Sequence, residues 1–425
     1  MRTMTTVLGV LLGLASAVQV GESLSAEAAL PLHDGRDGYR PAVGFGKDIY
    51  LVAWQSGMAR EGDIVACRVD KSGRALDAKP IVISAAEDDQ ERPRVCFAGA
   101  PGAPGGGGGG GGVFLVVWQD LRNEKDYDVY AARVSPDGKV LDPEGFPVAA
   151  GAHNQAMPQV CFDGKDFLVV WQDFRSGKKY EIYGARVSTD GKVLDPKGFL
   201  VAGSDKPYLH RTTPAVASRG DGKCLVVWGG GSGVGYVSNL LRFGGTVIAA
   251  GKPQKAFEIR QKEGHKKTPR AGVRMNLAAG PKGYIVVWRS WASVGRSPGP
   301  SRDASAYTFG ANGKPGKPFF PTGGTRYLMD PDIAWDGSAY IVAWYEQSSR
   351  PKVKNQPHDK VRAIRVSQEG KPAGPEHVLA GSFASPAKAA ALTTDGAGTT
   401  LIAYEKHPET GAAPIKIAFR VLGTR

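Results

Sequence analysis

The sequence predicts an all-β fold: a seven-bladed β-propeller of four-stranded antiparallel blades, whose ring is closed by an N-terminal strand completing the last blade. Three observations predict it: an aromatic marker that recurs seven times, tight-turn pairs between short apolar runs, and a last copy that lacks one strand. A period of this size indicates a radial array of repeated units. The markers follow β-branched runs at intervals of 53 to 64 residues and are Trp54, Trp118, Trp171, Trp228, Trp288, Trp344 and Tyr404.

Each copy of the repeat contains four short apolar runs that are typical of strands. In the clearest copy these runs begin at Pro158, Phe167, Glu181 and Phe199. Asp-Gly pairs separate the first run from the second and the third run from the fourth. Because such pairs tolerate the positive φ of two-residue hairpins, we expect the four strands to be antiparallel neighbours.

The two ends of the chain complement each other. The seventh copy runs through its third strand at 415–421 and has no fourth strand. Ahead of the first copy, the segment 29–32 has the same pattern as the fourth strand of the second copy at 146–149. We therefore expect residues 29–32 to pair antiparallel with residues 415–421, which would close the ring and remove two exposed sheet edges.

The N-terminus has the pattern of an export signal. Arg2 precedes a short apolar stretch at 7–14 and a small-residue cleavage site that ends at Ala17. The apolar stretch is too short to span a bilayer comfortably, and no later stretch approaches its length. We expect a secreted or periplasmic protein that is cleaved after Ala17.

Composition agrees with one large exported domain. The chain has 425 residues with 58 glycines and 29 prolines, which suits many short strands joined by turns. We assign residues 1–17 to the signal peptide, 18–28 to a short linker and 29–425 to a single propeller domain. The formal net charge of +13 favours anionic partners, and no cofactor is expected.

Two signatures stand out in the second and third copies. They are Trp118-Gln-Asp-Leu-Arg122 and Trp171-Gln-Asp-Phe-Arg175, each followed by an Asp/Glu-x-Tyr-x-x-Arg-Val strand. The whole chain after the signal resembles secreted bacterial β-propeller repeat proteins with these signatures, and the resemblance implies the propeller fold but no particular activity. We interpret the Asp and Arg as a turn cap with a salt bridge. A Ca²⁺ site in the loop 120–128 is the alternative, although its spacing differs from that of known calcium loops.

The four cysteines predict buried free thiols. Cys96 and Cys161 share a strand position with Gly44 and Ala217, where only small residues occur. This position indicates a face packed against the next blade, where cysteine serves as a small apolar residue. Disulfides and metal binding are the less favoured alternatives for these residues and for the other two cysteines, Cys67 and Cys224.

Histidines and basic residues gather in loops that we expect on one face of the ring. His153, His210 and His265 could form a metal site if they converge, although no His-x-His pair supports one. The loops of the fifth and sixth copies are strongly basic and contain one tryptophan that could stack on a sugar or base. The predicted polyanion-binding residues are Lys266, Lys267, Arg270, Trp291, Arg296, Arg302, Arg350, Lys352 and Lys354.

These observations favour a secreted binding module over an enzyme. No carboxylate pair or nucleophile motif stands out, so we predict no catalytic residue. The expected partner is an acidic polysaccharide, an anionic envelope polymer or an envelope protein, in preference to nucleic acid. The alternative is a glycan-active enzyme, a metal-assisted lyase or a hydrolase, with its site at the channel mouth.

Overall fold

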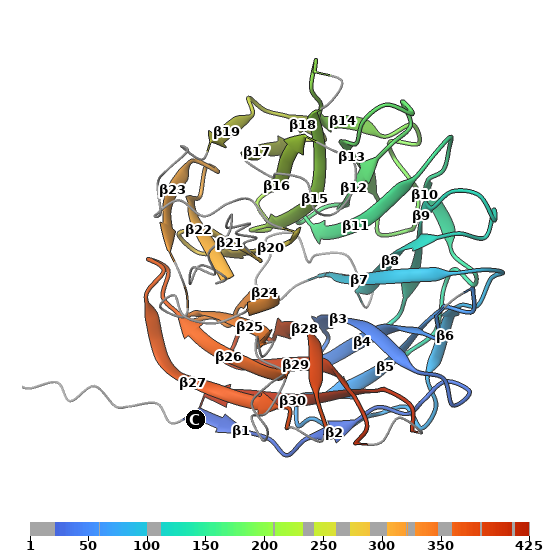
Figure 1. The fold of residues 1–425 in the computed structure, drawn as a ribbon, viewed down its shortest axis with the longest axis vertical. Helices are drawn as coiled ribbons and strands as arrows, with labels where there is room; N and C mark the ends of the chain where they lie inside the picture. Colours follow the sequence, from blue (N-terminus) through green and yellow to red (C-terminus); the bar gives the residue numbers. More distant parts are fainter. Residues whose placement is uncertain are drawn as a thin grey trace, which may run out of the picture.

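The protein is a ring of seven twisted β-sheets around a central axis (Figure 1). The computed structural model describes residues 22–58, 60–99, 112–206, 209–232, 242–260, 273–289, 304–319, 321, 328–346, 359–382, 385–409 and 413–424. These residues form strands and turns and contain no helix. Within the same ranges there is accordingly no apolar helix with the length needed to cross a membrane.

Each of the first six blades is a separate antiparallel sheet. Blade 1 is formed by β3 (Gly38–Gly46), β4 (Ile49–Ser56), β5 (Asp63–Asp70) and β6 (Ile81–Ser84). Blade 2 is formed by β7 (Gln90–Ala98), β8 (Val113–Asp120), β9 (Asp128–Val134) and β10 (Phe146–Ala149). Blade 3 is formed by β11 (Gln155–Phe162), β12 (Phe167–Asp173), β13 (Glu181–Val187) and β14 (Phe199–Ala202). Blade 4 is formed by β15 (Leu209–Ser218), β16 (Lys223–Ser232), β17 (Arg242–Ala249) and an outer strand in two pieces, β18 (Lys252–Pro253) and β19 (Phe257–Arg260).

The remaining blades complete the ring. Blade 5 is formed by β20 (Val273–Gly280), β21 (Gly283–Arg289), β22 (Ala304–Gly310) and β23 (Pro315–Phe319). Blade 6 is formed by β24 (Leu328–Trp335), β25 (Tyr340–Glu346), β26 (Lys360–Val366) and β27 (Pro372–Ala380). Blade 7 combines β28 (Ala387–Thr394), β29 (Thr399–Lys406) and β30 (Lys416–Thr424) with two N-terminal strands, β1 (Glu22–Leu24) and β2 (Ala28–Ala29). The predicted seven-bladed propeller of four-stranded blades is confirmed.

The hydrophobic core lies between the blades. In the described residues the buried apolar side chains form seven clusters, and each cluster joins two adjacent blades. All seven aromatic markers are buried in these layers. The position shared by Gly44 and the cysteines faces the next blade as predicted, because a Cβ at Gly44 would lie 2.6 Å from Cγ1 of Val95. Stability therefore comes from blade-on-blade packing around the whole ring.

The ring is closed by the N-terminal segment, over residues that differ from the predicted ones. Ala28 and Ala29 pair with Phe419 and Ala418, and the Leu30 N–H donates to the Ile417 carbonyl at 2.8 Å. The expected strand 29–32 is wrong in its bounds, since pairing stops before Pro31, which has no N–H to donate.

The closing segment also extends further toward the N-terminus than predicted. Glu22 to Leu24 pair with Leu422 to Thr424, so pairing also involves residues beyond the predicted partner strand 415–421. Both ends of the described chain therefore lie at the outer side of blade 7 (Figure 1).

Candidate functional site

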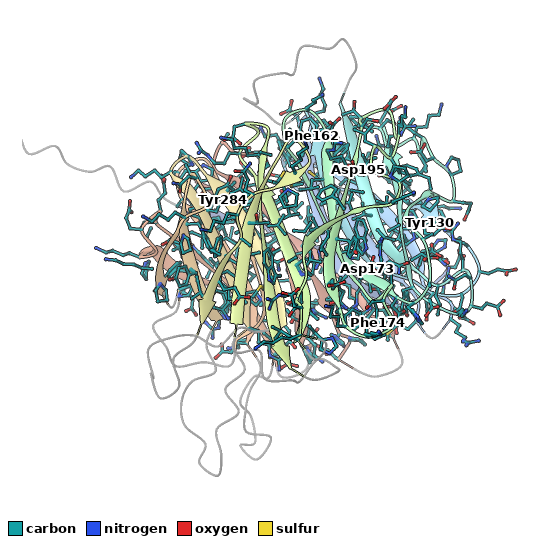
Figure 2. All side chains as sticks on the ribbon, turned by 90° about the horizontal axis from the view of Figure 1, so that it is seen from above. Tyr130, Phe162, Asp173, Phe174, Asp195 and Tyr284 are labelled. Atoms are coloured by element: carbon teal, nitrogen blue, oxygen red, sulfur yellow. The ribbon has the colours of Figure 1, made fainter. Side chains whose placement is uncertain are left out.

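The two faces of the ring differ in the connections that they carry. Figure 2 shows Phe162, at the turn between β11 and β12, near one face, and Phe174, in the loop after β12, near the opposite face. We refer to them as the Phe162 face and the Phe174 face. The innermost strands, β3, β7, β11, β15, β20, β24 and β28, run from the Phe174 face toward the Phe162 face and line the central channel.

The predicted polyanion-binding residues lie outside the described residues, and so does His265. This set comprises Lys266, Lys267, Arg270, Trp291, Arg296, Arg302, Arg350, Lys352 and Lys354. The basic-loop hypothesis therefore stays a prediction.

The two described histidines of the predicted metal site contact the same aromatic pair. The His153 ring packs edge-on to Phe174 at 5.9 Å, Phe174 packs on Tyr180 at 4.7 Å, and Tyr180 packs on His210 at 6.0 Å. The Tyr180 N–H donates to Nδ1 of His210 at 3.1 Å, which occupies that ring nitrogen. Across the described part of the chain, no group of three His, Cys, Asp or Glu side chains is arranged to hold a metal ion.

The four cysteines are free thiols. Three of them are buried and Cys96 is half-buried. Burial raises the pKa of Cys67 to about 11 and that of Cys96 to about 12, so both stay protonated and weakly reactive at neutral pH. The Sγ atoms of Cys161 and Cys224 lie 3.2 Å apart across the interface of blades 3 and 4.

The Trp-Gln-Asp-x-Arg signature is a structural clip, as predicted. In blade 2, Nε1 of Trp118 donates to Oδ2 of Asp120 at 2.7 Å. Arg122 donates to the same carboxylate through its backbone N–H and its guanidinium, which lies 4.0 Å from the centre of the Tyr130 ring. In the same loop, Asn123 caps the turn by accepting the N–H groups of Lys125 and Asp126 at 2.9 Å, and its amide donates to Oδ2 of Asp128 at 2.9 Å.

Blade 3 repeats this clip. Asp173 accepts from Trp171 at 2.7 Å and from Arg175 at 2.6 Å, and the Arg175 guanidinium lies 3.8 Å from the centre of the Tyr183 ring. Because both carboxylates are consumed by partners within their own blades, the signature residues stabilise the scaffold and leave ligand binding to other residues.

A ring of seven β-bulges, which the sequence did not reveal, surrounds the channel. Each innermost strand shifts register at the same point, next to a residue with positive φ. These residues are Arg40, Arg92, Met157, Thr213, Arg274, Asp330 and Ala389, with φ between 44° and 58°. Left-handed non-glycine residues are uncommon, and bulges re-aim side chains next to functional sites. The signal was a proline directly after five of the seven positions.

Side chains from the preceding blade hold several bulges in place. Gln119 of blade 2 accepts the Met157 N–H of blade 3 at 3.2 Å, and Gln172 of blade 3 accepts the Thr213 N–H of blade 4 at 3.3 Å. Each glutamine directly follows an aromatic marker. The Gln of the signature thus ties blade 2 to the bulge of blade 3 and blade 3 to the bulge of blade 4, which supports the wall of the channel there.

The bulges surround a polar cavity of about 190 Å³ in the half of the channel nearer the Phe174 face. All seven innermost strands contribute to its walls. The charged and amide side chains in its lining are Arg40, Arg92, Arg94, Gln159, Arg274, Asn276, Asp330 and Asp332. Four arginines stand against two aspartates in the lining and against Glu91, which forms ion pairs with Arg40 and Arg92. One positive charge remains in excess, which favours an anionic ligand.

The arginines of this cavity differ in their partners. Arg40 donates to Oε2 of Glu91 at 2.9 Å, and Nη1 of Arg274 donates to Oδ2 of Asp330 at 2.5 Å. Arg94 donates instead to uncharged oxygens, to Oε1 of Gln159 at 3.2 Å and to the Pro93 carbonyl at 3.1 Å. Among the described residues no carboxylate lies within ion-pair distance of Arg94.

Burial shifts the pKa of two charged groups in the lining of this cavity, Arg94 and Asp332. Desolvation lowers the pKa of Arg94, and the charge of Asp332 only partly offsets that shift. Desolvation also raises the pKa of Asp332, although its carboxylate accepts the backbone N–H groups of Leu392 and Ile333 at 2.9 Å. A guanidinium without an ion-pair partner in a desolvated site gains more from a bound anion than an exposed one does.

The half of the channel nearer the Phe162 face is wider and more apolar. Its cavity of about 750 Å³ is bordered by Phe45, Phe97, Phe162 and Trp335. The two cavities share six aliphatic residues, which we call the aliphatic belt. The belt consists of Val43, Val95, Val160, Val216, Leu277 and Leu392.

The comparisons with known proteins extend to fold alone. No protein-family model matches the chain, and no characterised protein matches its sequence. A protein of unknown function from Dyadobacter fermentans is similar in structure, with a TM-score of 0.51 and 13% identity over 95% of this chain and 100% of that chain.

Two further structures align less closely. The Aleuria aurantia lectin aligns with a TM-score of 0.47 and 12% identity over 81% of this chain and 97% of that chain. The GH93 α-L-arabinofuranosidase of Fusarium graminearum aligns with a TM-score of 0.47 and 9% identity over 94% of this chain and 97% of that chain. Identities this low establish no shared activity. The chain is thus a seven-bladed β-propeller with a positively charged pocket in its channel.

Proposed function

We propose that this protein is an exported, non-catalytic binding propeller that captures a carboxylate of an acidic glycan in the cavity near the Phe174 face. One observation carries the proposal: Arg94 lies half-buried in the cavity wall without a carboxylate within ion-pair distance in the described chain, and burial lowers its pKa. A bound carboxylate would fill that place with charge-assisted hydrogen bonds, and the planar guanidinium suits bidentate contacts.

The other groups in the cavity suit a hydroxylated acid. Gln159 and Asn276 present amide groups on blades 3 and 5, and Arg40, Arg92 and Arg274 surround them with positive charge. Side-chain amides both donate to and accept from sugar hydroxyls. Carboxylates accept when they are ionised and can donate when they are protonated. The basic loops of the fifth and sixth copies would add long-range attraction, and an N-terminal export signal would bring the protein to a cell-surface polymer; both remain proposals.

Binding of free uronic acids tests the proposal. Glucuronate and galacturonate should bind the wild type in calorimetric titrations, and their neutral parent sugars should bind far more weakly. Arg94→Gln should lower the affinity about 10- to 100-fold, because a hydrogen bond to a charged group contributes about 1.5 to 3 kcal/mol.

Two further variants complete that experiment. Arg94→Lys keeps the charge without the planar fork and should fall between the wild type and Arg94→Gln. Lys139→Gln, on an exposed turn at the opposite face, is the matched control and should bind as the wild type does. Equal affinities for all four proteins, or for acidic and neutral sugars, would contradict the proposed function.

A glycan-cleaving enzyme is the second candidate, favoured by the two aspartates of the same cavity. Desolvation raises the pKa of Asp332, whereas Asp330 is ion-paired with Arg274. Two carboxyl groups in such different environments can serve as a proton donor and an ionised partner. Release of reducing ends from an acidic polysaccharide by the wild type, but not by Asp332→Asn, would favour this candidate over simple binding.

A further inference from the structure

We infer that the cavity recognises the end of an acidic glycan chain rather than an internal stretch of it. The inference rests on the proposed function, because it specifies which part of the same ligand occupies the same site. The shape of the cavity and the chemistry of its floor carry it, independently of the charges that attract the anion.

The walls of the cavity leave no path across the site. All seven innermost strands contribute side chains to it, so the protein surrounds it on every side about the ring axis. Sites that bind the middle of a polymer need a groove that is open at two ends, so that the chain can enter and leave. A site enclosed by a closed ring admits a ligand only along the axis.

The aliphatic belt also disfavours passage of a chain through the channel. Its residues line both the cavity and the wider cavity near the Phe162 face, so a chain would have to pass them. Its members, such as Val95, Val160 and Leu277, offer no hydrogen-bonding groups on their side chains. Moving hydroxyl and carboxylate groups past them without compensating hydrogen bonds would cost several kcal/mol per group. A polar chain that enters from the Phe174 face should therefore stop at the belt.

The volume of the cavity sets how much of the chain can enter. At about 190 Å³ it is smaller than the roughly 300 to 1,000 Å³ of pockets that hold drug-sized ligands. This space suits one terminal acidic residue. The bulge residues Arg40, Arg92 and Arg274 lie in the wall above Arg94 along the innermost strands, so the cationic groups follow the direction of axial access.

A chain-length series of uronic-acid oligomers tests this inference. Monomers, trimers, decamers and polymers of about 100 residues should bind the wild type with similar affinity per mole of chain ends. Affinity per gram should then fall about 100-fold from monomer to polymer. A constant affinity per gram, or one that rises with length, would overturn end recognition.

Arg94→Gln and Lys139→Gln distinguish this failure from failure of the proposed function. If the monomer does not bind, or if Arg94→Gln binds the monomer as the wild type does, the proposed function itself is wrong. If the monomer binds through Arg94 but affinity follows chain mass, the pocket is correct and only end recognition is wrong. Both the proposed function and end recognition are supported if Arg94→Gln loses affinity, Lys139→Gln keeps it, and the affinity of the wild type follows the number of chain ends.

Discussion

Blades 2 and 3 differ from blades 4 and 6 in how they satisfy their buried marker tryptophans. In blades 2 and 3 the indole N–H of Trp118 or Trp171 donates to the aspartate two residues later. In blades 4 and 6 the indole N–H groups of Trp228 and Trp344 find no hydrogen-bond partner among the described residues. The marker tryptophan therefore occupies the equivalent core position in blades that have the clip and in blades that lack it.

The difference shows that packing positions the tryptophan and that the signature adds local stability. Trp344 is as deeply buried as Trp118 although it lacks the Asp and Arg that follow the marker in blade 2. A buried, unsatisfied N–H costs about 1 to 3 kcal/mol, which blades 4 and 6 tolerate because the surrounding apolar core is intact. The charged side chains in the cavity lining come from blades 1, 2, 5 and 6, so the complete signature and a charged group of the cavity coincide only in blade 2.

Blade 7 is the extreme of this comparison, because it lacks both the signature and a fourth strand of its own. Removing residues 18–34 should destabilise the protein by about 5 kcal/mol or more, through loss of the β1 and β2 hydrogen bonds and of the buried Leu30. Thermal unfolding measures the effect. Removing only residues 1–17 is the control and should leave the melting temperature unchanged; a similar melting temperature for both truncations would refute closure by this segment.

The clip itself is tested by a pair of substitutions at equivalent positions. Asp173→Ala in blade 3 should cost about 3 kcal/mol, because it leaves the buried Trp171 N–H and part of Arg175 without a partner. Glu346→Ala, two residues after Trp344 in blade 6, should cost less than about 1 kcal/mol, since it removes a partly exposed pair with Arg362. Denaturant titrations of both variants would contradict the comparison if the two losses were equal.

The tie between blades should have a smaller effect. Gln172→Ala removes the acceptor of the Thr213 N–H and should destabilise the protein by about 1 kcal/mol. Gln172→Glu keeps an acceptor oxygen and should recover part of that loss. If Gln172→Ala matched the wild type in chemical denaturation, the glutamine of the signature would not contribute to the interface of blades 3 and 4.

Stability should depend on pH through Asp332. Its folded-state pKa lies above the ordinary value of 3.8, so between these two pKa values the folded protein holds a proton that the unfolded chain has lost. Stability should therefore fall as pH rises from 3.8 through the folded-state pKa, by at most about 1.4 kcal/mol per pH unit. Asp332→Asn should unfold at a higher temperature than the wild type at pH 7 and at nearly the same temperature at pH 3. A lower melting temperature for the variant at pH 7 would show that the ionised carboxylate stabilises the fold.

The thiols should have no effect on stability until the protein unfolds. We expect slow reaction of all four cysteines with a thiol reagent in the folded protein and four reactive thiols after denaturation without reductant. A count of two would indicate that Cys161 and Cys224, with Sγ atoms 3.2 Å apart, had been oxidised to a disulfide across blades 3 and 4.

The fold could be predicted from the sequence because blade packing repeats a local pattern. Each marker ends a β-branched run, and both features follow from burial between two blades. Small residues at the position of Gly44 likewise report contact with the next blade. The register of the closing strand depends instead on pairing between the chain ends, and the missing N–H of Pro31 was the only local guide to where pairing stops.

The candidate site was less accessible to sequence reasoning. Arg94 lies in a Pro-x-Val strand pattern that indicates blade packing, and nothing local shows that the adjacent bulge turns this strand end toward a cavity. The four arginines also come from three strands that are far apart in sequence, β3, β7 and β20, and these strands meet only because the ring closes. Charge density directed attention to the basic loops, whereas the described structure places an enclosed positive site on the strands.

The pairing at the ring closure has a mechanical consequence. Glu22 lies opposite Thr424, so a force that separates these two residues would load the hydrogen bonds of the closing strand one after another, like a zipper. Pairing that is pulled apart from one end in this way resists little force, because only one hydrogen bond carries the load at a time. A force applied along the axis through a ligand held in the channel would instead be shared among all seven innermost strands. The ring should therefore withstand tension on its ligand far better than tension between its own ends.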